Sequence, residues 1–401
     1  MFKSLSLKVI IFGFIFTFFS SFGQSFFLGL FNSSIRDTLS ITQGQFGTIY
    51  ASATLLSSFL LIWVGKKIDD INIFKFAFFV TILLSFSCFF FSKISSITFL
   101  FIAIFLMRFS GQGMMSHTAT TTISRFFTKS RGKALSTSWF GLSTAEFILP
   151  VLIVYLLTIT SWQNLWIYIS ILVLIFLPIT SFILVKSLNF DSREETSQQE
   201  FNENIKQWKR VEVLRDYRFY IVCLNMLAMP WIATGVFVYQ SFITDAKEWG
   251  SFVIAQSFMV YSILSVVTLL GSGFLIDKFT SRKLLIFMNI PLLLSTLVLF
   301  YFDNPITSFI FLGLIGISNG LANVLGSSTW AEIYGVKYIG SIKALTTALM
   351  VFSTAFGTAL FGFLIDRGFT IEQITMVSFI YIAISLIMLF FVRNRLNPQY
   401  I

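Results

Sequence analysis

The residues of this chain that could do chemistry are few. There is one histidine, His117, and the two cysteines, Cys88 and Cys223, lie in separate apolar runs. The sequence contains no H-E-x-x-H, G-x-x-x-x-G-K-[ST] or C-x-x-C pattern. These spacings are typical of zinc, phosphate and thiol-based sites. We therefore predict that the chain is not an enzyme and needs no metal, nucleotide or other cofactor.

Two opposite charges fall in the middle of long apolar runs. Arg108 follows Ser96 by 12 residues, and Glu146 follows Ala134 by 12 residues. Each would lie about 18 Å along a helix that rises 1.5 Å per residue. Ionisable groups at that depth in a membrane are costly, so function is the first hypothesis for them. His117 would lie about 31 Å along its helix, and we interpret it as a hydrated side chain at the membrane surface.

Three roles are open for the two deep charges. On neighbouring antiparallel helices they could form an ion pair that only stabilises the bundle. Arg108 could instead donate paired hydrogen bonds to a substrate carboxylate, for which the planar guanidinium is suited. Glu146 could carry a proton, because the charge of a buried carboxyl depends on the groups around it. These roles can coexist if the pair opens when substrate or proton competes for one partner.

Uncharged polar residues inside apolar runs form a second set of candidates, because a polar group in hydrocarbon needs a hydrogen-bond partner. For each residue alone, bonding between helices is the simpler explanation, but together they could line a polar cavity. Asn319 and Asn323 are one helical turn apart and so share a face. The candidates that join Arg108 and Glu146 in binding substrate or coupling ion are Gln24, Asn225, Asn319 and Asn323.

The elements that must position these side chains are membrane-spanning helices. Hydrophobic residues make up 56% of the 401 residues and charged residues only 11%, whereas a soluble domain carries about 25% charged residues. A bilayer needs about 20 apolar residues per helix, and these runs are too continuous for barrel strands. We predict an all-α integral membrane protein with twelve spans, at residues 9–31, 44–64, 73–92, 96–120, 134–158, 164–186, 218–243, 250–276, 284–301, 306–329, 341–365 and 373–392.

Lys and Arg are distributed asymmetrically between the loops. If the N-terminus is inside, 23 of the 28 lie in inner segments, four in outer segments and Arg108 within a span. Because positive charge is retained in the cytoplasm, we predict that both termini are cytoplasmic and that the protein lies in a bacterial plasma (inner) membrane. The net charge of +10 then faces anionic lipid and is no sign of nucleic-acid binding. Tryptophans expected as interfacial anchors are Trp63, Trp162, Trp166, Trp249 and Trp330.

The chain reads as two halves joined by a polar linker. Residues 188–217 form the only long polar stretch, with balanced charges, so we predict six-helix halves at 1–187 and 218–401. A faint repeat supports this division. Gly65 and Asp69 follow span two, and Gly273 and Asp277 follow span eight, 208 residues later. Duplicated halves with broken symmetry are typical of secondary transporters.

At these residues the chain resembles the major facilitator superfamily over essentially its full length. The family's cytoplasmic loop motif is G-x-L-x-D-R-x-G-R-[RK], and the second copy here retains more of it than the first. The resemblance implies two pseudo-symmetric six-helix halves, a cavity lined by spans one, four, seven and ten, and a latch that holds one conformation. Because the first copy lacks the basic residues, we expect a weaker latch there. The latch residues are Gly65, Asp69, Gly273, Asp277, Lys278 and Arg282.

A further resemblance concerns the branch of the family. Arg125-Phe126-Phe127, the run 131–135 (R-G-K-A-L) and Pro150 are similar to the monocarboxylate-transporter and oxalate/formate-exchanger branch. This implies a transporter that moves a small organic anion, such as a monocarboxylate, by alternating access. We expect a monomer whose partners are the lipid bilayer, a small-molecule substrate and a coupling proton. Two alternatives are proton-coupled efflux of hydrophobic compounds and a transporter-like sensor that moves nothing.

Overall fold

The computed structural model describes residues 2–127, 131–186 and 206–398, and every regular element in these ranges is a helix. Twelve helices among the described residues are long and apolar enough to cross a membrane, as the sequence predicts. They are Leu5–Gly23, Gln43–Asp70, Ile73–Phe91, Ile97–Phe126, Lys133–Leu157, Trp162–Val185, Tyr217–Val238, Ser251–Ile276, Ser281–Tyr301, Ile306–Tyr334, Ile339–Asp366 and Ile371–Arg395. The predicted all-α class is confirmed.

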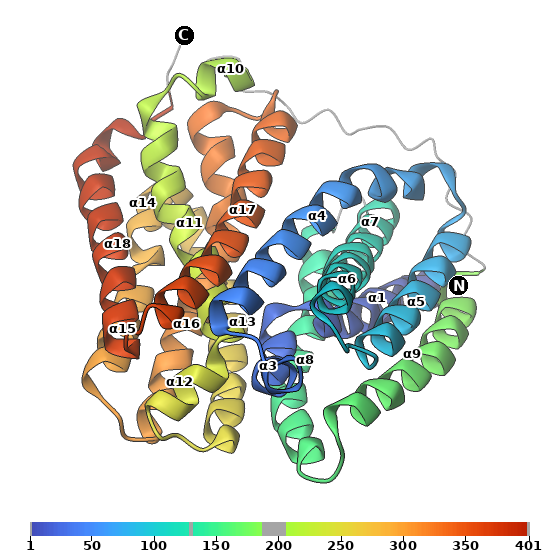
Figure 1. Cartoon of the computed structure of the whole chain (residues 1–401). Coiled ribbons are helices and arrows are strands. Elements are labelled where there is room, and N and C mark those ends of the chain that lie inside the picture. The colour runs from blue at the N-terminus through green and yellow to red at the C-terminus, as the bar shows by residue number, and fades with distance from the viewer. Residues whose placement is uncertain (1, 128–130, 187–205, 399–401) are drawn as a thin grey trace. The chain divides into compact units, whose positions relative to one another are not determined.

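Several spans are made of more than one element (Figure 1). The first nine α-helices and three short elements are α1 (Phe2–Ser20), η1 (Ser21–Gly23), α2 (Ser25–Leu28), η2 (Gly29–Phe31), α3 (Asn32–Leu39), α4 (Gln43–Asp70), α5 (Ile73–Phe91), α6 (Ile97–Met107), η3 (Arg108–Met115), α7 (Ser116–Phe126), α8 (Arg131–Leu157) and α9 (Trp162–Val185). The remaining elements are α10 (Arg210–Val213), α11 (Tyr217–Val238), α12 (Gln240–Ala246), α13 (Ser251–Phe279), α14 (Ser281–Leu284), η4 (Leu285–Met288), α15 (Ile290–Tyr301), α16 (Ile306–Tyr334), α17 (Ile339–Asp366), α18 (Ile371–Val392) and η5 (Arg393–Arg395).

Helix ends differ from the sequence prediction mainly where a helix continues beyond its apolar run. Helix α4 runs to Asp70 and α13 to Phe279, so the first copy of the motif predicted as a loop and the start of the second copy are the last turns of long helices. Arg282 of the second copy lies in the next helix, α14. Helix α16 likewise continues to Tyr334. The reason is that hydropathy marks only the part of a helix inside the hydrocarbon, whereas hydrogen bonding continues into the aqueous region until a capping residue ends it.

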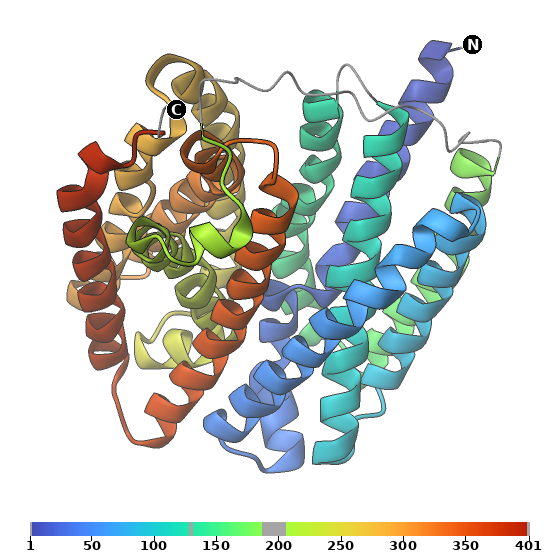
Figure 2. The ribbon, with the colours of Figure 1, turned by 90° about the horizontal axis from the view of Figure 1, so that it is seen from above.

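The chain divides into two compact units. The first comprises Met1–Glu194 with Phe237–Ser241 and Thr358–Asp366, and the second comprises Glu195–Val236, Phe242–Gly357 and Arg367–Ile401. In the first unit α5 packs against α9 and α1 packs against α8, and α5 and α9 lie next to each other in Figure 1. Figure 2 shows the ribbon of the chain from above. Most of the linker predicted at 188–217 lies outside the described residues. Its last part contains the short helix α10.

Hydrogen bonds explain why two late segments belong to the first unit. The buried Tyr239 hydroxyl donates to the Thr358 carbonyl at 2.8 Å or to the Gln43 carbonyl at 3.1 Å. The Asn32 side-chain amide donates to the Val238 carbonyl at 2.7 Å. Each of these contacts gives a buried polar group the partner that it needs away from water.

Glycines allow close packing in the second unit. A Cβ on Gly316 would overlap the Tyr261 carbonyl oxygen, and one on Gly320 would lie 2.5 Å from the Ser265 carbonyl oxygen. Helices α13 and α16 therefore approach backbone to backbone, as small residues permit in membranes.

Four of the five tryptophans expected as interfacial anchors are core residues instead. Trp162, Trp166, Trp249 and Trp330 are at most 7% exposed, and only Trp63 is half exposed. Trp166 packs against Phe91, with ring centroids 4.5 Å apart. A position near a helix end does not tell which face of the helix a ring occupies, and a large ring that faces the bundle is buried by its neighbours.

Candidate functional site

The first span predicted from the sequence, residues 9–31, is not one continuous helix. Helix α1 ends at Ser20, the 3₁₀ turn η1 ends at Gly23, and Gln24 has an extended backbone (φ −83°, ψ 153°) before α2 begins at Ser25. An interruption leaves backbone groups outside the helical hydrogen-bond pattern, and in a membrane these need other partners. Discontinuous spans of this kind are where transporters build binding sites.

Arg108 supplies one of these partners. Its Nη1 donates to the Gly23 carbonyl oxygen at 3.1 Å and to the Ser25 hydroxyl at 3.3 Å. Its guanidinium lies over the Tyr50 ring, with Cζ 5.4 Å from the ring centroid, and the Tyr50 hydroxyl donates to Ser25 Oγ at 3.1 Å. Spans one, two and four therefore meet around one buried cation, which the aromatic face stabilises further.

Arg108 is also the first residue of a π-helical segment, η3, that lies inside the fourth span. A Cβ built on Gly111 of this segment would lie 2.7 Å from the Gly23 nitrogen and 2.8 Å from its Cα. A Cβ on Gly23 would overlap the Met107 carbonyl oxygen. The wider π turn and the two glycines thus bring the backbone of span four against the interruption in span one, and π segments are frequent at functional sites.

The charge of Arg108 is not neutralised by a carboxylate within the described residues. The side chain is 3% exposed, it makes no ion pair, and its buried Nε has no hydrogen-bond partner among those residues. The ion pair with Glu146 that the sequence allowed is not formed. The contacts of Arg108 are all with neutral groups, so its positive charge is retained, and Nε is a buried donor without a partner among the described residues.

Glu146 lies in α8, a helix that packs against α1 in the first unit. Its side chain is 8% exposed and forms no ion pair or hydrogen bond with the described residues. The close contact of α8 with α1 is made at Gly141, where a Cβ would overlap the Phe14 carbonyl oxygen. A buried carboxyl without a fixed partner can change its protonation state at little structural cost.

The uncharged candidates fall into the two units separately. Gln24 is the extended residue of the span-one interruption, directly between the two residues that Arg108 contacts. In the second unit, Asn225 is fully buried, and both polar atoms of its side chain lack a partner among the described residues. Asn319 donates to the Ser265 hydroxyl at 3.0 Å, while Asn323 is exposed. Asn319 therefore bonds between helices, and Asn225 retains unused hydrogen-bonding capacity.

The first copy of the latch motif has a cationic partner from another helix. Asp69 forms an ion pair with Arg125, whose Nη1 also donates to the Ile68 carbonyl at 3.0 Å. His117 Nε2 lies 3.0 Å from the Gly65 carbonyl oxygen, so it donates there, and a Cβ on Gly65 would meet the same nitrogen at 3.3 Å. A cavity of about 290 Å³ borders these residues. Arg125 thus gives Asp69 the basic partner that the first copy of the motif itself lacks. His117 is half-buried rather than free at the surface.

The second copy is arranged differently. A Cβ built on Gly273 would meet nothing within 4 Å. Asp277 and Lys278 lie in the last turns of α13, and Lys278 is exposed. Glu332 of α16 accepts the backbone N–H groups of Ser281 at 2.8 Å and Arg282 at 3.2 Å. A carboxylate therefore caps the start of α14, and it comes from span ten instead of from the motif itself.

Sequence reasoning named Arg108, Glu146 and Gln24 as candidates but did not name Ser25 and Tyr50, which contact Arg108. Ser25 and Tyr50 were passed over because a serine or a tyrosine inside a span is common. Their depth does not single them out, since Tyr50 lies only in the second turn of α4 and Ser25 follows the extended residue Gln24. Among the described residues, no three His, Cys, Asp or Glu side chains gather so that they could hold a metal ion.

Comparison with known proteins agrees with this architecture. The structure of a bacterial homologue of the human lysosomal transporter Spinster is similar, with a TM-score of 0.72, 12% identity, and coverage of 98% of this chain and 97% of that chain. The nucleoside transporter NupG is similar with a TM-score of 0.70, 14% identity and coverage of 98% of both chains. At these identities the likeness concerns the fold. No curated protein sequence matches this chain.

The sequence itself matches the Major Facilitator Superfamily over residues 13–358, which is most of the chain. Together with the twelve apolar helices, this match makes the chain an integral multi-pass membrane protein and a transporter rather than an enzyme. The chain belongs to the Major Facilitator Superfamily.

Proposed function

We propose that the chain is a secondary transporter for a small organic anion and that Arg108 is the anion's main cationic ligand. The observation that carries this proposal is the buried guanidinium with no carboxylate partner among the described residues. A charge taken out of water costs several kcal/mol unless an opposite charge compensates it. A bound anion would supply the opposite charge. The free-energy cost of the uncompensated guanidinium would therefore favour binding of an anion.

The surroundings of Arg108 support recognition of a carboxylate. Gly23 and Ser25 hold Nη1 on one side of the guanidinium, and Tyr50 covers its face. Nε remains available as a donor. A guanidinium fixed in this way can donate to a carboxylate with little loss of side-chain entropy. The similarity of Arg125 and the run 131–135 to the monocarboxylate branch points to the same substrate class.

The two halves of such a transporter would expose the site alternately to each side of the membrane. Glu146 is our candidate for the proton carrier, since its carboxyl is buried and lacks a fixed partner among the described residues. Exchanging Glu146 for Gln, which cannot ionise, should spare substrate exchange between vesicle compartments but remove the acceleration of uptake by an inward proton gradient. Uptake by E146Q that still follows the gradient would exclude this role.

A ligand panel tests the substrate class directly. The purified protein would be heated with formate, oxalate, lactate, uridine or a hydrophobic cation, and the apparent melting temperature recorded. A ligand that binds the folded state raises this temperature by mass action. We expect a rise with one or more carboxylates and none with uridine or the cation.

The matched variants are Arg108→Gln and Lys93→Gln, since both remove one positive charge and Lys93 is exposed at a loop. R108Q should lose the ligand-dependent rise, whatever its melting temperature without ligand, and K93Q should keep it. A rise with uridine alone, or with carboxylates in R108Q, would contradict the proposal.

A further inference from the structure

The end of the linker is bonded to the second unit before the chain enters span seven. The Trp208 backbone N–H donates to the Tyr334 carbonyl at 3.0 Å, and the Lys337 backbone N–H donates to Gln207 Oε1 at 3.0 Å. Tyr334 is the last residue of α16, and Lys337 lies in the turn 335–338 that leads to α17. The linker is therefore attached to the turn between spans ten and eleven.

A glycine in this turn makes room for the linker. Gly335 has φ 80° and ψ 173°, a backbone conformation that is essentially restricted to glycine. A Cβ built on Gly335 would overlap Gln207 Oε1. The Gln207 side chain thus lies directly over the glycine, where its oxygen accepts the Lys337 N–H.

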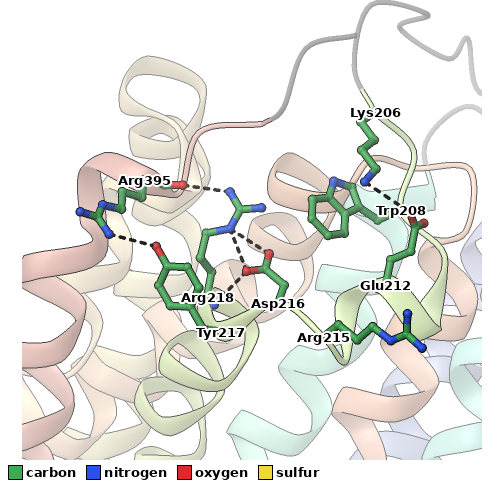
Figure 3. A pocket seen from close by; sticks show the side chains of 8 residues that line it. All are labelled: Lys206, Trp208, Glu212, Arg215, Asp216, Tyr217, Arg218 and Arg395. Carbon is green, nitrogen blue, oxygen red and sulfur yellow. Dashed lines mark hydrogen bonds and ion pairs between the residues drawn. The ribbon is translucent and has the colours of Figure 1, made fainter.

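Trp208 anchors the contact. Its side chain is 8% exposed and packs edge to face on Tyr334, with ring centroids 5.4 Å apart. Lys206 Nζ lies 4.0 Å and Arg218 Cζ lies 5.4 Å from the centroid of the Trp208 ring (Figure 3). A buried aromatic ring contributes much of the energy of such a contact, and cations near its face add to it. Residues 206–208, which we call the strap, are therefore docked by side chains as well as by the backbone.

A buried ion pair extends the contact to the end of span twelve. Arg218 Nε donates to both carboxylate oxygens of Asp216, at 2.8 and 3.1 Å, and its Nη1 donates to the Arg395 carbonyl at 2.9 Å. The Tyr334 hydroxyl donates to Asp216 at 3.1 Å. Tyr334 is thus held through its carbonyl by Trp208 and through its hydroxyl by Asp216.

The strap and the ion pair line the same pocket, of about 500 Å³, at one end of the second unit (Figure 3). The charges of the loops predict that this end, which we call the inner end, faces the cytoplasm. Contacts run without a break from the turn after span ten, through the strap and the start of span seven, to the end of span twelve. Packed side chains and hydrogen bonds joined in this way can carry energetic coupling between helices.

We propose that the strap ties the inner ends of spans seven, ten and twelve into one body, so that these spans move together in the transport cycle. Alternating access is largely the movement of whole repeats, which requires that the helices of one repeat keep their places relative to each other. The strap does this at a point where the three helix ends would otherwise meet only through the ion pair. The proposal rests on the proposed transport cycle but not on an anionic substrate.

Hydrogen exchange of the full chain in detergent, followed by mass spectrometry, tests the proposal without any substrate. Gln207→Ala removes the acceptor of the Lys337 N–H, and Gly335→Ala places a methyl group where Gln207 lies. In both variants the amides of 335–338 and those of 393–397 should exchange about fivefold faster or more, the change expected from the loss of one hydrogen bond. A contact that acts only locally would affect 335–338 alone.

The matched control is Gly368→Ala in the same unit. Gly368 has φ 82°, close to that of Gly335, but a Cβ there would meet nothing within 4 Å. G368A therefore introduces the same backbone strain without displacing the strap, and exchange at 335–338 and 393–397 should stay as in the unmodified chain. If G335A does not fold, Q207A alone serves, because it only shortens a half-buried side chain.

Transport in reconstituted vesicles gives the second readout. Q207A should carry whichever ligand the unmodified chain carries at a rate several-fold lower, with the same ligand-dependent rise in melting temperature, since the strap makes no contact with Arg108. If no tested ligand is carried, the proposed function fails, and the exchange measurement still decides the role of the strap. Faster exchange at 335–338 alone, equal exchange in G335A and G368A, or an undiminished transport rate in Q207A would overturn the proposal.

Discussion

The nitrogens of the Arg108 guanidinium differ in their contacts. Nη1 compensates the Gly23 carbonyl at the interruption of span one, and Nε is left without a partner among the described residues. The contact of Nη1 is structural, whereas Nε can still donate a hydrogen bond to a ligand. A role in folding and a role in binding therefore do not exclude each other, and mutants of Arg108 must be read by their response to ligand.

The role of Asp69 in the proposed latch can be tested cleanly, because the next residue, Asp70, provides a control. Both Asp69 and Asp70 are exposed, but Asp69 pairs with Arg125 of another helix, whereas Asp70 lies 3.7 Å from Lys67 within its own helix. If the Asp69–Arg125 ion pair is part of the latch, Asp69→Asn should slow transport in vesicles several-fold, whereas Asp70→Asn should leave transport unchanged.

The stability of both variants should change by less than about 1 kcal/mol, since exposed ion pairs contribute little. Thermal unfolding in detergent would check this. A transport defect shared equally by D69N and D70N, or shown by neither, would remove Asp69 from the latch. Restoration by the exchanged pair Asp69→Arg with Arg125→Asp would show that the pairing itself matters.

The sequence predicted the positions of charged residues along their helices better than it predicted the partners of those residues. The depth of Arg108 followed from helix geometry alone, because one residue's height along a helix needs no knowledge of its neighbours. That Arg125 meets Asp69, or that Glu332 caps the turn at Ser281, depends on which helices adjoin and how they are rotated. These are tertiary properties, and no spacing within one span encodes them.

At the scale of elements, the interruption at Gln24 and the π segment at Arg108 belong together. Each departs from regular α-helix, and the two meet where Gly23 and Gly111 allow their backbones to touch. The twelve spans could be predicted because apolar length is a property of the sequence. The interruption could not, since no proline marks it and the local backbone depends on the contact with span four.

Replacing Gly111 by Ala should therefore disrupt this crossing. The new methyl group would lie within 2.8 Å of the Gly23 backbone, which has no flexible side chain to move aside. Overpacking of this kind costs about 1–3 kcal/mol, so the apparent melting temperature should fall by several degrees and transport should be lost.

Gly113→Ala in the same π segment is the matched control. Its Cβ would meet the Leu61 side chain at 3.3 Å, and that side chain can move. G113A should therefore melt close to the unmodified protein. Equal melting of G111A and G113A would show that the two backbones are not in contact at this point.

At the scale of the whole molecule, family membership and twelve spans establish a multi-pass transporter, and the loop charges predict its orientation. Cys88 and Cys223 are both buried in the core, so an impermeant maleimide should not reach them. Single cysteines would then replace the exposed residues Lys66 and Lys93, which flank α5.

An impermeant maleimide should label Lys93→Cys in intact cells and Lys66→Cys only in inverted vesicles. The reason is that α5 crosses the membrane once between them and the cation-rich side is retained in the cytoplasm. Labelling of both positions from the same side would show that α5 does not cross, and the reverse pattern would invert the predicted topology.

Counterflow in reconstituted vesicles tests the central claim most directly. Vesicles loaded with unlabelled oxalate or lactate would be diluted into the same labelled carboxylate, with labelled uridine as the neutral comparison. The account predicts transient accumulation of a labelled carboxylate, no accumulation of uridine, and an initial rate at least about tenfold lower in R108Q, because a hydrogen bond to a charged group contributes about 1.5–3 kcal/mol. Carboxylate counterflow at an undiminished rate in R108Q, or counterflow of uridine alone, would contradict it.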